Sequence, residues 1–486
     1  MKFSPLFLFL LFTVMISAQE HRSIHQSDLE YYKTFQYEKG ITEPNEIIPL
    51  QFDKSAGNAK IVFGFLPYWE YPGALTWLRY DILTHISAFD FQIDSLGNVS
   101  FPSGWPWTNM INSAHQNGVK VIMTAVNFDA SQIHWLITNT SAKQNFFAKV
   151  KATINQYSLD GVNIDFEGLN TADRGTVING FMTELTNYIH TELPGKEVSF
   201  AGPAVNWSGW NLQGLAASCD YIFIMGYDFT GSWSTNTGAT APLIGGGYNI
   251  TNTVNTQYAG CPPEKLILGV PYYGCEWVAN TNQPGSTISS YIGHPRFYTA
   301  MAQVQNYSLI WHNTSQTVYY TIPNNNKFNQ IWFDNDSSTA LKFNLAKQKN
   351  LRGVGMWALG YDRDRSELWT ELTKYLAPAS VEDVEPLPED YQISAYPNPF
   401  SSNSGSGNSS TNVVFTVPEA GNSNLILYDL LGRVIYEKDL GFLSPGRYSE
   451  SVNIMNSLST GTYFVRVTTG SAVSIKSMMV KLLILN

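Results

Sequence analysis

Polar and apolar side chains alternate in DGVNIDFEG at residues 160–168. Successive side chains of a strand point to opposite faces, so Asn163, Asp165 and Glu167 share one face. At a rise of about 3.3 Å per residue, the α-carbons of Asp165 and Glu167 lie about 6.6 Å apart. Two carboxyl groups this close can share a proton, or one can raise the pKa of the other, as a general acid requires. The alternative is a structural pair held by backbone donors, and the spacing by itself favours that alternative.

Eight short apolar runs follow one another between Ile61 and Met356, each trailed by a loop and a helix-like segment. They read IVFGFLPYW, LTHISAFDF, KVIMTAV, LDGVNIDFE, VSFAGPAV, DYIFIMGYD, LILGVPYYG and GVGMWALGYD. Eight strands alternating with helices predict an α/β fold, a (β/α)8 TIM barrel. A doubly wound sheet needs fewer units, and no glycine-rich phosphate loop follows the first run. Active sites of such barrels lie at the carboxyl ends of the strands, where Glu167 is expected.

Three further regions depart from this pattern. Residues of about 277–335, between the seventh and eighth runs, contain SLIWHNTSQTVYYTIPNNNKFNQIWF, which predicts a small α+β insertion. The proline-rich, acidic residues 379–391 read as a linker. Short alternating runs with Gly and Ser turns in residues 392–486 predict a C-terminal antiparallel β-sandwich.

The amino-terminal residues 1–18 have the form of a secretory signal peptide, cut after Ala18. An uncleaved anchor is the alternative, although the apolar run is short for a membrane span. Residues 19–58 form an N-terminal extension in which no motif is readable. The three cysteines permit at most one disulfide.

Composition excludes one class of partner and hints at another. The net charge is −10 and no basic run occurs, which argues against a nucleic-acid partner. The chain has 13 Trp, 27 Tyr and 27 Phe, more rings than its core requires, which hints at a surface that uses flat rings. No metal and no cofactor are expected.

DGVNIDFEG resembles the signature of glycoside hydrolase family 18, the chitinase family, which reads Asp-Gly-x-Asp-x-Asp-x-Glu on the fourth barrel strand. Asp160, Gly161, Asp165 and Glu167 match it, while Asn163 replaces the middle aspartate. The stretches MGYDFTGSW, VPYYG and GMWALGYD resemble the family's sixth, seventh and eighth strands. The resemblance therefore covers the whole barrel, assigned to residues 59–378.

The resemblance implies substrate-assisted retaining hydrolysis, an exception to the rule of two catalytic carboxylates. Glu167 would protonate the glycosidic oxygen, Asp165 would orient the substrate's N-acetyl group, and Tyr227 would donate a hydrogen bond to it. Asn163 cannot ionise, which leaves the pH optimum open. The implied substrate-binding residues are Asp228, Trp357, Met225, Tyr273, Trp69, Trp233, Phe65 and Asn163, with Phe128 as a further candidate. For each single ring, plain packing is the alternative.

The last domain also resembles a known one. YPNPF at residues 396–400, LYDLLGRVIY, LSTGTYFVRV and SIKSMMVK are similar to the sorting domain of the type IX secretion system. This implies export, followed by surface attachment or release. A carbohydrate-binding sandwich is the alternative, but residues 392–486 contain no tryptophan.

The expected function is that of a secreted, monomeric chitinase cleaving β-1,4-linked N-acetylglucosamine polymers. An N-acetylglucosaminidase of the same family that acts on peptidoglycan or the N-glycan core remains open, because both glycans carry the required N-acetyl group. A chitin-binding lectin is a third reading, although such lectins usually lack the acid that Glu167 provides here.

Overall fold

The computed structural model describes residues 22–35, 37, 41–57, 59–377, 390–401, 411–418, 421–443, 446–452, 458–471 and 474–485. The chain divides into two compact units, Met1–Leu376 and Ala377–Asn486. The predicted signal peptide lies outside the described residues. Within them, no helix has the length and apolar character needed to span a bilayer.

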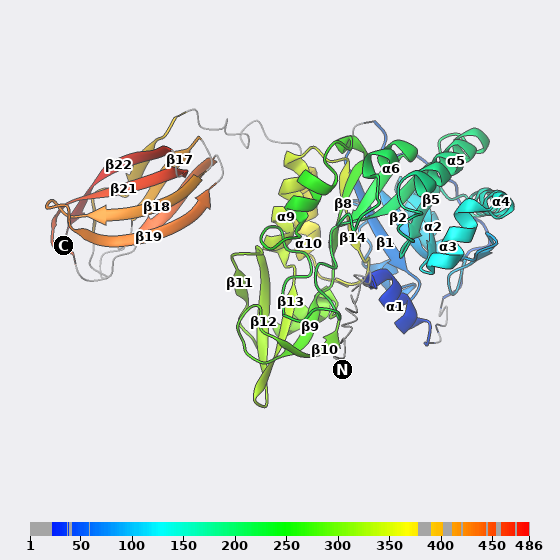
Figure 1. Ribbon diagram of the computed structural model, residues 1–486, viewed down its shortest axis with the longest axis horizontal. Helices are drawn as coiled ribbons and strands as arrows, with labels where there is room; N and C mark the ends of the chain where they lie inside the picture. Colours follow the sequence, from blue (N-terminus) through cyan, green and yellow to red (C-terminus); the bar gives the residue numbers. More distant parts are fainter. Residues whose placement is uncertain are drawn as a thin grey trace, which may run out of the picture. The chain divides into compact units, whose positions relative to one another are not determined.

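The first unit is a closed barrel of eight parallel strands (Figure 1). In chain order these are β1 (Ile61–Pro67), β2 (His85–Ile93), β4 (Lys120–Asn127), β5 (Gly161–Phe166), β6 (Glu197–Pro203), β7 (Tyr221–Met225), β8 (Leu266–Pro271) and β14 (Gly353–Trp357). Pairing of β1 with both β14 and β2 closes the ring. The two-residue strand β3 (Val99–Ser100) pairs antiparallel with β2 outside it. The predicted (β/α)8 barrel is confirmed.

Helices surround the barrel. They are α2 (Thr108–Gln116), α3 (Ala130–Thr138), α4 (Thr140–Gln156), α5 (Thr176–Glu192), α6 (Leu212–Ser218), α7 (Ile250–Asn252), α9 (Asp336–Gln348) and α10 (Glu367–Leu376), with short helical turns at Gly73–Thr76, Thr253–Gln257 and Pro263–Lys265.

Strand β5 shows the expected alternation. Val162, Ile164 and Phe166 are buried, and the Phe166 ring contacts Phe146 of α4 and Phe181 of α5. At Gly161 a β-carbon would lie 2.3 Å from the carbonyl oxygen of Glu197, so β5 and β6 can pair this closely only with glycine there. The opposite face of β5 is thereby directed into the barrel.

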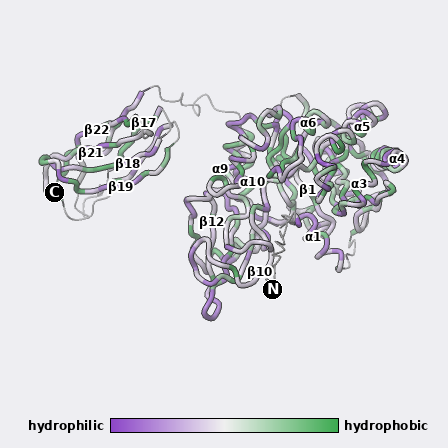
Figure 2. The backbone as a smooth tube through the Cα atoms, viewed as in Figure 1, coloured by the Kyte–Doolittle hydropathy of each residue, from purple (hydrophilic) through white to green (hydrophobic). Residues whose placement is uncertain are grey.

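A second sheet is inserted between β8 and β14. Its order is β10 (Ile288–Gly293), β9 (Cys275–Ala279), β13 (Lys327–Phe333), β12 (Thr317–Asn324) and β11 (Ile310–His312), and it is accompanied by α8 (Phe297–Gln303). Trp277, Tyr319 and Trp332 form a small core of its own. The turn joining β12 to β13, the Asn-rich stretch of the sequence, is hydrophilic (Figure 2). The α+β insertion is confirmed.

The second unit is a β-sandwich. One sheet consists of β15 (Ile393–Tyr396), β17 (Thr411–Val417) and β20 (Gly446–Val452). The other consists of β16 (Phe400–Ser401), β22 (Ser474–Leu485), β21 (Gly461–Ser471), β18 (Gly421–Tyr428) and β19 (Val434–Leu443). Phe415 of the first sheet shares one hydrophobic core with Leu427 and Val465 of the second. All pairings are antiparallel except the short one between β16 and β22, which confirms the predicted sandwich.

The three cysteines, Cys219, Cys261 and Cys275, are buried and carry free thiols. The possible disulfide that the cysteine count allows is therefore not formed.

A helix precedes the barrel in sequence. Helix α1 (Ile24–Tyr32) is capped by Ser23, whose hydroxyl accepts a hydrogen bond from the Gln26 amide. The helix packs against the barrel through Ile24 and Leu29 (Figure 1). Residues 41–57 continue along α2, where the Glu43 carboxylate accepts hydrogen bonds from the Tyr71 hydroxyl and the Asn109 amide.

At the amino ends of the strands, Glu197 is the centre of a polar cluster. Its carboxylate binds Nε2 of His85 at 2.9 Å, the Lys120 ammonium group and the Tyr221 hydroxyl. Burial by itself would raise the pKa of Glu197, but the charges and hydrogen bonds of His85 and Lys120 outweigh it and hold that pKa well below its usual range.

We expect Glu197→Gln to lower the free energy of unfolding by about 3 kcal/mol at pH 7, because it removes one member of a largely buried ion pair. A depressed carboxyl pKa contributes stability above the unfolded-state pKa of about 4.3, and this contribution is lost as the pH falls. Denaturant unfolding at several pH values should show the difference between the two proteins shrinking below about pH 4. Glu192→Gln removes an exposed ion pair with Lys151 and should cost less than about 1 kcal/mol; equal losses for both variants would contradict the assignment.

Candidate active site

The main sequence-predicted residues gather at the carboxyl ends of three barrel strands, β5, β7 and β14. Asp165 is the second-last residue of β5, and Glu167 is the first residue after that strand. Tyr227 and Asp228 come just after β7, and Trp357 ends β14. Loops at this end of a parallel barrel carry the active sites of such folds, so these side chains lie where chemistry is expected.

Asp165, Tyr227 and Trp357 converge on one flat ring, the imidazole of His25 at the start of α1. Nδ1 of His25 lies 2.8 Å from Oδ2 of Asp165, and Nε2 lies 2.8 Å from the Tyr227 hydroxyl. The imidazole stacks on the Trp357 indole with ring centroids 3.8 Å apart and an interplanar angle of 27°. Both Asp165 and His25 are fully buried. The carboxylate, the phenol and the indole thus bind the edges and the face of the same small planar group.

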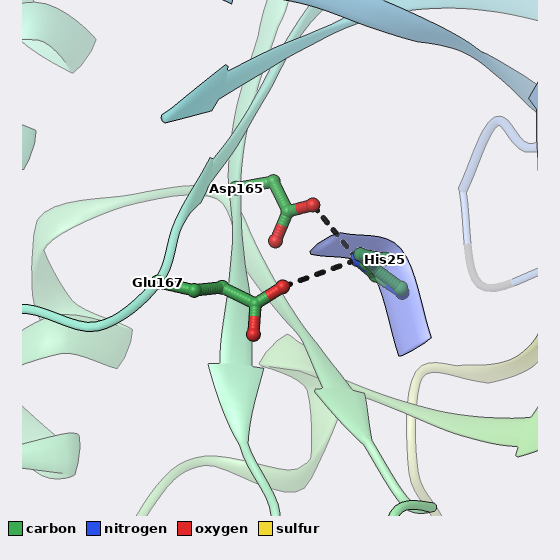
Figure 3. Close-up of side chains that lie close together, drawn as sticks. All are labelled: His25, Asp165 and Glu167. Carbon is green, nitrogen blue, oxygen red and sulfur yellow. Dashed lines mark hydrogen bonds and ion pairs between the residues drawn. The ribbon is translucent and has the colours of Figure 1, made fainter. Parts of the chain in front are cut away.

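Glu167 lies beside this ring but nearer to solvent (Figure 3). Its Oε1 lies 3.5 Å from Nδ1 of His25 and accepts a hydrogen bond of 2.8 Å from the Ser23 hydroxyl. The Glu167 side chain is 15% exposed, whereas that of Asp165 is 0% exposed. The two carboxylates of the strand motif therefore have different surroundings, as distinct chemical roles require.

Asp228 completes this part of the site. Its Oδ2 accepts a hydrogen bond of 2.6 Å from the Ile24 amide, and its Oδ1 accepts one from the Tyr273 hydroxyl. Burial raises the pKa of Asp228, although both of these donors oppose the shift. Burial, together with the negative charges of Asp165 and Asp228, raises the pKa of Tyr227 far above its usual value, so its phenol keeps its proton.

On one side of Trp357, the aromatic surface continues to Trp69. The Trp69 indole stacks on the Tyr32 ring of α1, with centroids 4.7 Å apart at 14°. The Tyr32 hydroxyl accepts a hydrogen bond from Arg296, which is ion-paired with Glu70 at 2.6 Å. Trp69 therefore lies beside Trp357, but one face of its indole is covered by Tyr32 of the same chain.

On the other side of Glu167 a cleft of about 560 Å³ remains open. Six of the predicted residues or candidates line it: Phe128, Glu167, Met225, Tyr227, Asp228 and Trp233. Trp207 and Tyr248, which the sequence did not single out, also line it, are 45% and 50% exposed, and contact each other edge to face. Their exposure in a cleft is what identifies them, and no spacing in the sequence carries that information.

Phe65 and Asn163 lie deeper in the barrel. Phe65 packs against Trp357 and His25, while the Asn163 amide donates a hydrogen bond of 2.8 Å to the Ser199 hydroxyl. Within the described residues, neither Oδ1 of Asn163 nor Oδ1 of Asp165 has a hydrogen-bond partner. Both residues support the floor of the site rather than lining the open cleft.

His25, Asp165 and Glu167 also form a group of three possible metal ligands, whose ligand atoms lie within 4.8 Å of one another. Ligands at about 2.0–2.2 Å from a tetrahedral zinc ion are separated by more than 3 Å. The 2.8 Å between Nδ1 of His25 and Oδ2 of Asp165 instead fits a shared proton. The arrangement is therefore that of a hydrogen-bonded cluster.

The amino-terminal segment is the part of the site that the sequence did not predict. Four of its side chains contact residues of the site, namely Ser23, His25, Asp28 and Tyr32. No helical or strand periodicity of apolar residues marks these positions in the sequence. Asp28 accepts hydrogen bonds from the Tyr361 hydroxyl at 2.7 Å and from the Trp357 indole at 3.2 Å.

Several known proteins are similar in sequence to this chain. Di-N-acetylchitobiase of Rattus norvegicus is 28% identical over 297 residues, which cover 53% of this chain and 77% of that protein. The cortical fragment-lytic enzyme of Bacillus subtilis is 23% identical and covers 57% of this chain and 65% of its own. Chitinase A1 of Niallia circulans is 27% identical, covering 53% of this chain and 43% of its own.

The fold is shared with solved structures. A chitinase from Cycas revoluta in complex with an N-acetylglucosamine trimer superimposes with a TM-score of 0.59 at 23% identity, covering 65% of this chain and 99% of that one. The group IV chitinase of Ostrinia furnacalis gives 0.59 at 22%, covering 66% and 100%.

Sequence models of two families match the two units of the chain. The secretion system C-terminal sorting domain matches residues 394–481, so the sandwich is a type IX sorting domain and the protein is secreted or carried to the cell surface. Glycosyl hydrolases family 18 matches residues 31–362, which span the barrel and its insertion. The chain therefore belongs to glycosyl hydrolases family 18.

Proposed function

We propose that the protein is a retaining glycosidase that hydrolyses β-1,4-linked N-acetylglucosamine polymers, chitin above all, by substrate-assisted catalysis. The observation that supports it best is the convergence of Asp165 and Tyr227 on one flat group over Trp357. An acetamide group is flat, has one N–H donor and one carbonyl acceptor, and matches a carboxylate and a phenol placed in this way.

In the first step, Glu167 gives a proton to the glycosidic oxygen while the acetamide oxygen of the same sugar attacks the anomeric carbon. The bond to the leaving sugar breaks, and an oxazolinium ion forms. Asp165 accepts a hydrogen bond from the acetamide N–H, and its negative charge offsets the positive charge of the oxazolinium ion. Asp165 is buried, where such an interaction is strong. Tyr227, with its pKa raised by burial, remains a donor to the acetamide oxygen.

In the second step, the Glu167 carboxylate takes a proton from water, and the water oxygen attacks the anomeric carbon from the side that the leaving sugar vacated. The bond between the anomeric carbon and the acetamide oxygen breaks, which restores the neutral acetamide. Two inversions give net retention. The greater exposure of Glu167 suits this step, because water reaches it from the open cleft. Asp228 is placed to bind a hydroxyl of the same sugar. Its Oδ2 accepts a hydrogen bond from the Ile24 amide, and a sugar hydroxyl would donate to the same oxygen.

The choice of glycan rests on the relatives. Their names cover a chitobiase, a cortical fragment-lytic enzyme and a chitinase, so peptidoglycan is the second candidate substrate. A binding protein without activity would have no use for the Glu167 carboxylate in this position, which favours catalysis.

We expect a full-length His25→Ala chain to cleave a chitin hexasaccharide into shorter oligomers, and we use this variant because His25 fills the acetamide position. Adding Glu167→Gln should lower kcat/KM by at least about 100-fold, the usual share of general acid catalysis. Adding Asp165→Asn should lower it about as much, by removing charge stabilisation. Mass spectrometry measures the products, and proton NMR should find the β-anomer first.

An α-anomer as the first product would exclude the retaining mechanism. If the hexasaccharide survives but peptidoglycan fragments are cut in a Glu167-dependent manner, chitin is wrong and the second substrate is right. Survival of both glycans would favour the lectin reading.

A substitution of Trp207 tests whether the glycan binds in the open cleft. We expect Trp207→Ala, made in the same His25→Ala chain, to raise KM for the hexasaccharide about fivefold with little change in kcat, because loss of one stacking surface costs about 1 kcal/mol. Trp135→Ala is the matched control, since that ring is similarly exposed on α3 but does not line the cleft. Equal effects of the two variants on KM would place the substrate elsewhere.

A further inference from the structure

We propose that residues 22–35 form an autoinhibitory segment, whose His25 occupies the position of the substrate's reacting N-acetyl group, so that glycan cleavage requires this segment to leave. The proposal rests on the proposed function, because it identifies the group that His25 replaces. Four features of the segment support it.

The first feature is the chemistry of the imidazole. Under the proposed mechanism the acetamide closes into a flat five-membered ring with nitrogen and oxygen atoms, and imidazole is also flat and five-membered. With its proton on Nδ1, the ring donates to Asp165 and accepts from the Tyr227 hydroxyl, each at 2.8 Å. In its doubly protonated form it carries the same charge as the oxazolinium ion. His25 therefore uses the contacts that would stabilise the intermediate.

The second feature is that the neighbours of His25 bind the other catalytic groups. The Ser23 hydroxyl lies 2.8 Å from Glu167, the distance at which a leaving glycosidic oxygen would receive its proton. The Ile24 amide donates to Asp228, where a sugar hydroxyl would otherwise donate. Three successive residues thus occupy the acid, the acetamide position and the sugar-binding carboxylate.

The third feature is the coverage of the aromatic platform. Tyr32 stacks on Trp69, and Asp28 accepts hydrogen bonds from the Trp357 indole and the Tyr361 hydroxyl. Burial raises the pKa of Asp28 to about 6, against the opposing effect of these two donors. Arg22, Ser23 and Gln26 form part of the wall of the open cleft. A glycan chain can therefore enter that cleft but cannot continue across Glu167 onto Trp357 and Trp69.

The fourth feature is that the barrel does not need the segment in order to close. The ring of strands is completed by the pairing of β1 with β2 and β14, and α1 belongs to none of these pairings. Only three of its nine residues are buried, namely Ile24, His25 and Leu29. In the sequence, just five residues separate Phe35 from Ile41, and Glu43 is bound to the barrel.

Such a short connection makes docking intramolecular, with an effective concentration of the order of millimolar. A segment that is only moderately attracted to the site will thus exclude a glycan present at lower concentration. The observed kcat/KM then equals the value of the free site multiplied by the fraction of molecules in which the segment has left.

The test compares four full-length chains on the chitin hexasaccharide: native, His25→Ala, Asp28→Ala and Lys33→Ala. Both His25→Ala and Asp28→Ala should raise kcat/KM at least tenfold, and hydrogen exchange of the amides of residues 24–32 should become faster in both. Lys33→Ala changes an exposed residue at the end of the same helix and should match the native chain. Thermal unfolding checks that each variant is folded. If His25→Ala is not folded, Asp28→Ala is compared with the native chain by itself.

A peptide of residues 22–35, added to the His25→Ala chain, should inhibit it competitively, and the same peptide with His25→Ala should inhibit at least tenfold more weakly. Native and variant chains that cut the hexasaccharide at equal rates would overturn the autoinhibition while leaving the proposed function intact. If no chain cuts the hexasaccharide or peptidoglycan, even where hydrogen exchange shows the segment released, the proposed function fails and the inference fails with it.

Discussion

The whole site depends on the burial of Asp165 at the centre of a closed barrel. Alternation along β5 directs this carboxylate inward, and with residues 22–35 in place its side chain has no exposure to solvent. A buried charge is costly unless donors surround it, so something must bind Asp165 whether or not substrate is present. In this structure the His25 imidazole does so, and under the proposed mechanism the acetamide N–H of the substrate takes its place.

Differences in burial also give the other ionisable groups of the site different protonation behaviour. Burial raises the pKa of both Tyr227 and Asp228, and the charge of Asp165 adds to the shift of Tyr227. Glu167 is one residue beyond β5 and more exposed, so it can exchange protons with water in a way that Asp165 cannot. The i, i+2 spacing therefore does more than place two acids side by side: it places one inside the barrel and one at its edge.

Features that depend on local periodicity were predictable from the sequence. The eight strands, the inward face of Asn163, Asp165 and Glu167, and the sandwich all follow from runs of alternating or apolar residues, and the structure has them. Trp69 and Trp233 were expected near the site because they follow barrel strands, and the structure places Trp69 beside Trp357 and Trp233 in the cleft wall. Trp207 and Tyr248 lie in loops, where position is set by tertiary packing rather than by spacing. The contact of His25 with Asp165 joins residues 140 positions apart in the sequence, and no local pattern encodes it.

A segment that imitates the reacting group links inhibition to catalysis. An active site binds the transition state and its neighbouring intermediate more tightly than the substrate, so a side chain resembling that intermediate uses the strongest contacts available. Changes in Asp165, Tyr227 or Trp357 that improve catalysis would then also strengthen docking of His25, and changes that weaken docking at these residues would weaken catalysis. Relief of the inhibition without loss of activity must therefore act on the segment itself, through its removal or displacement. Residues 22–35 precede the barrel in the sequence, so they can be lost without breaking any strand pairing that closes it.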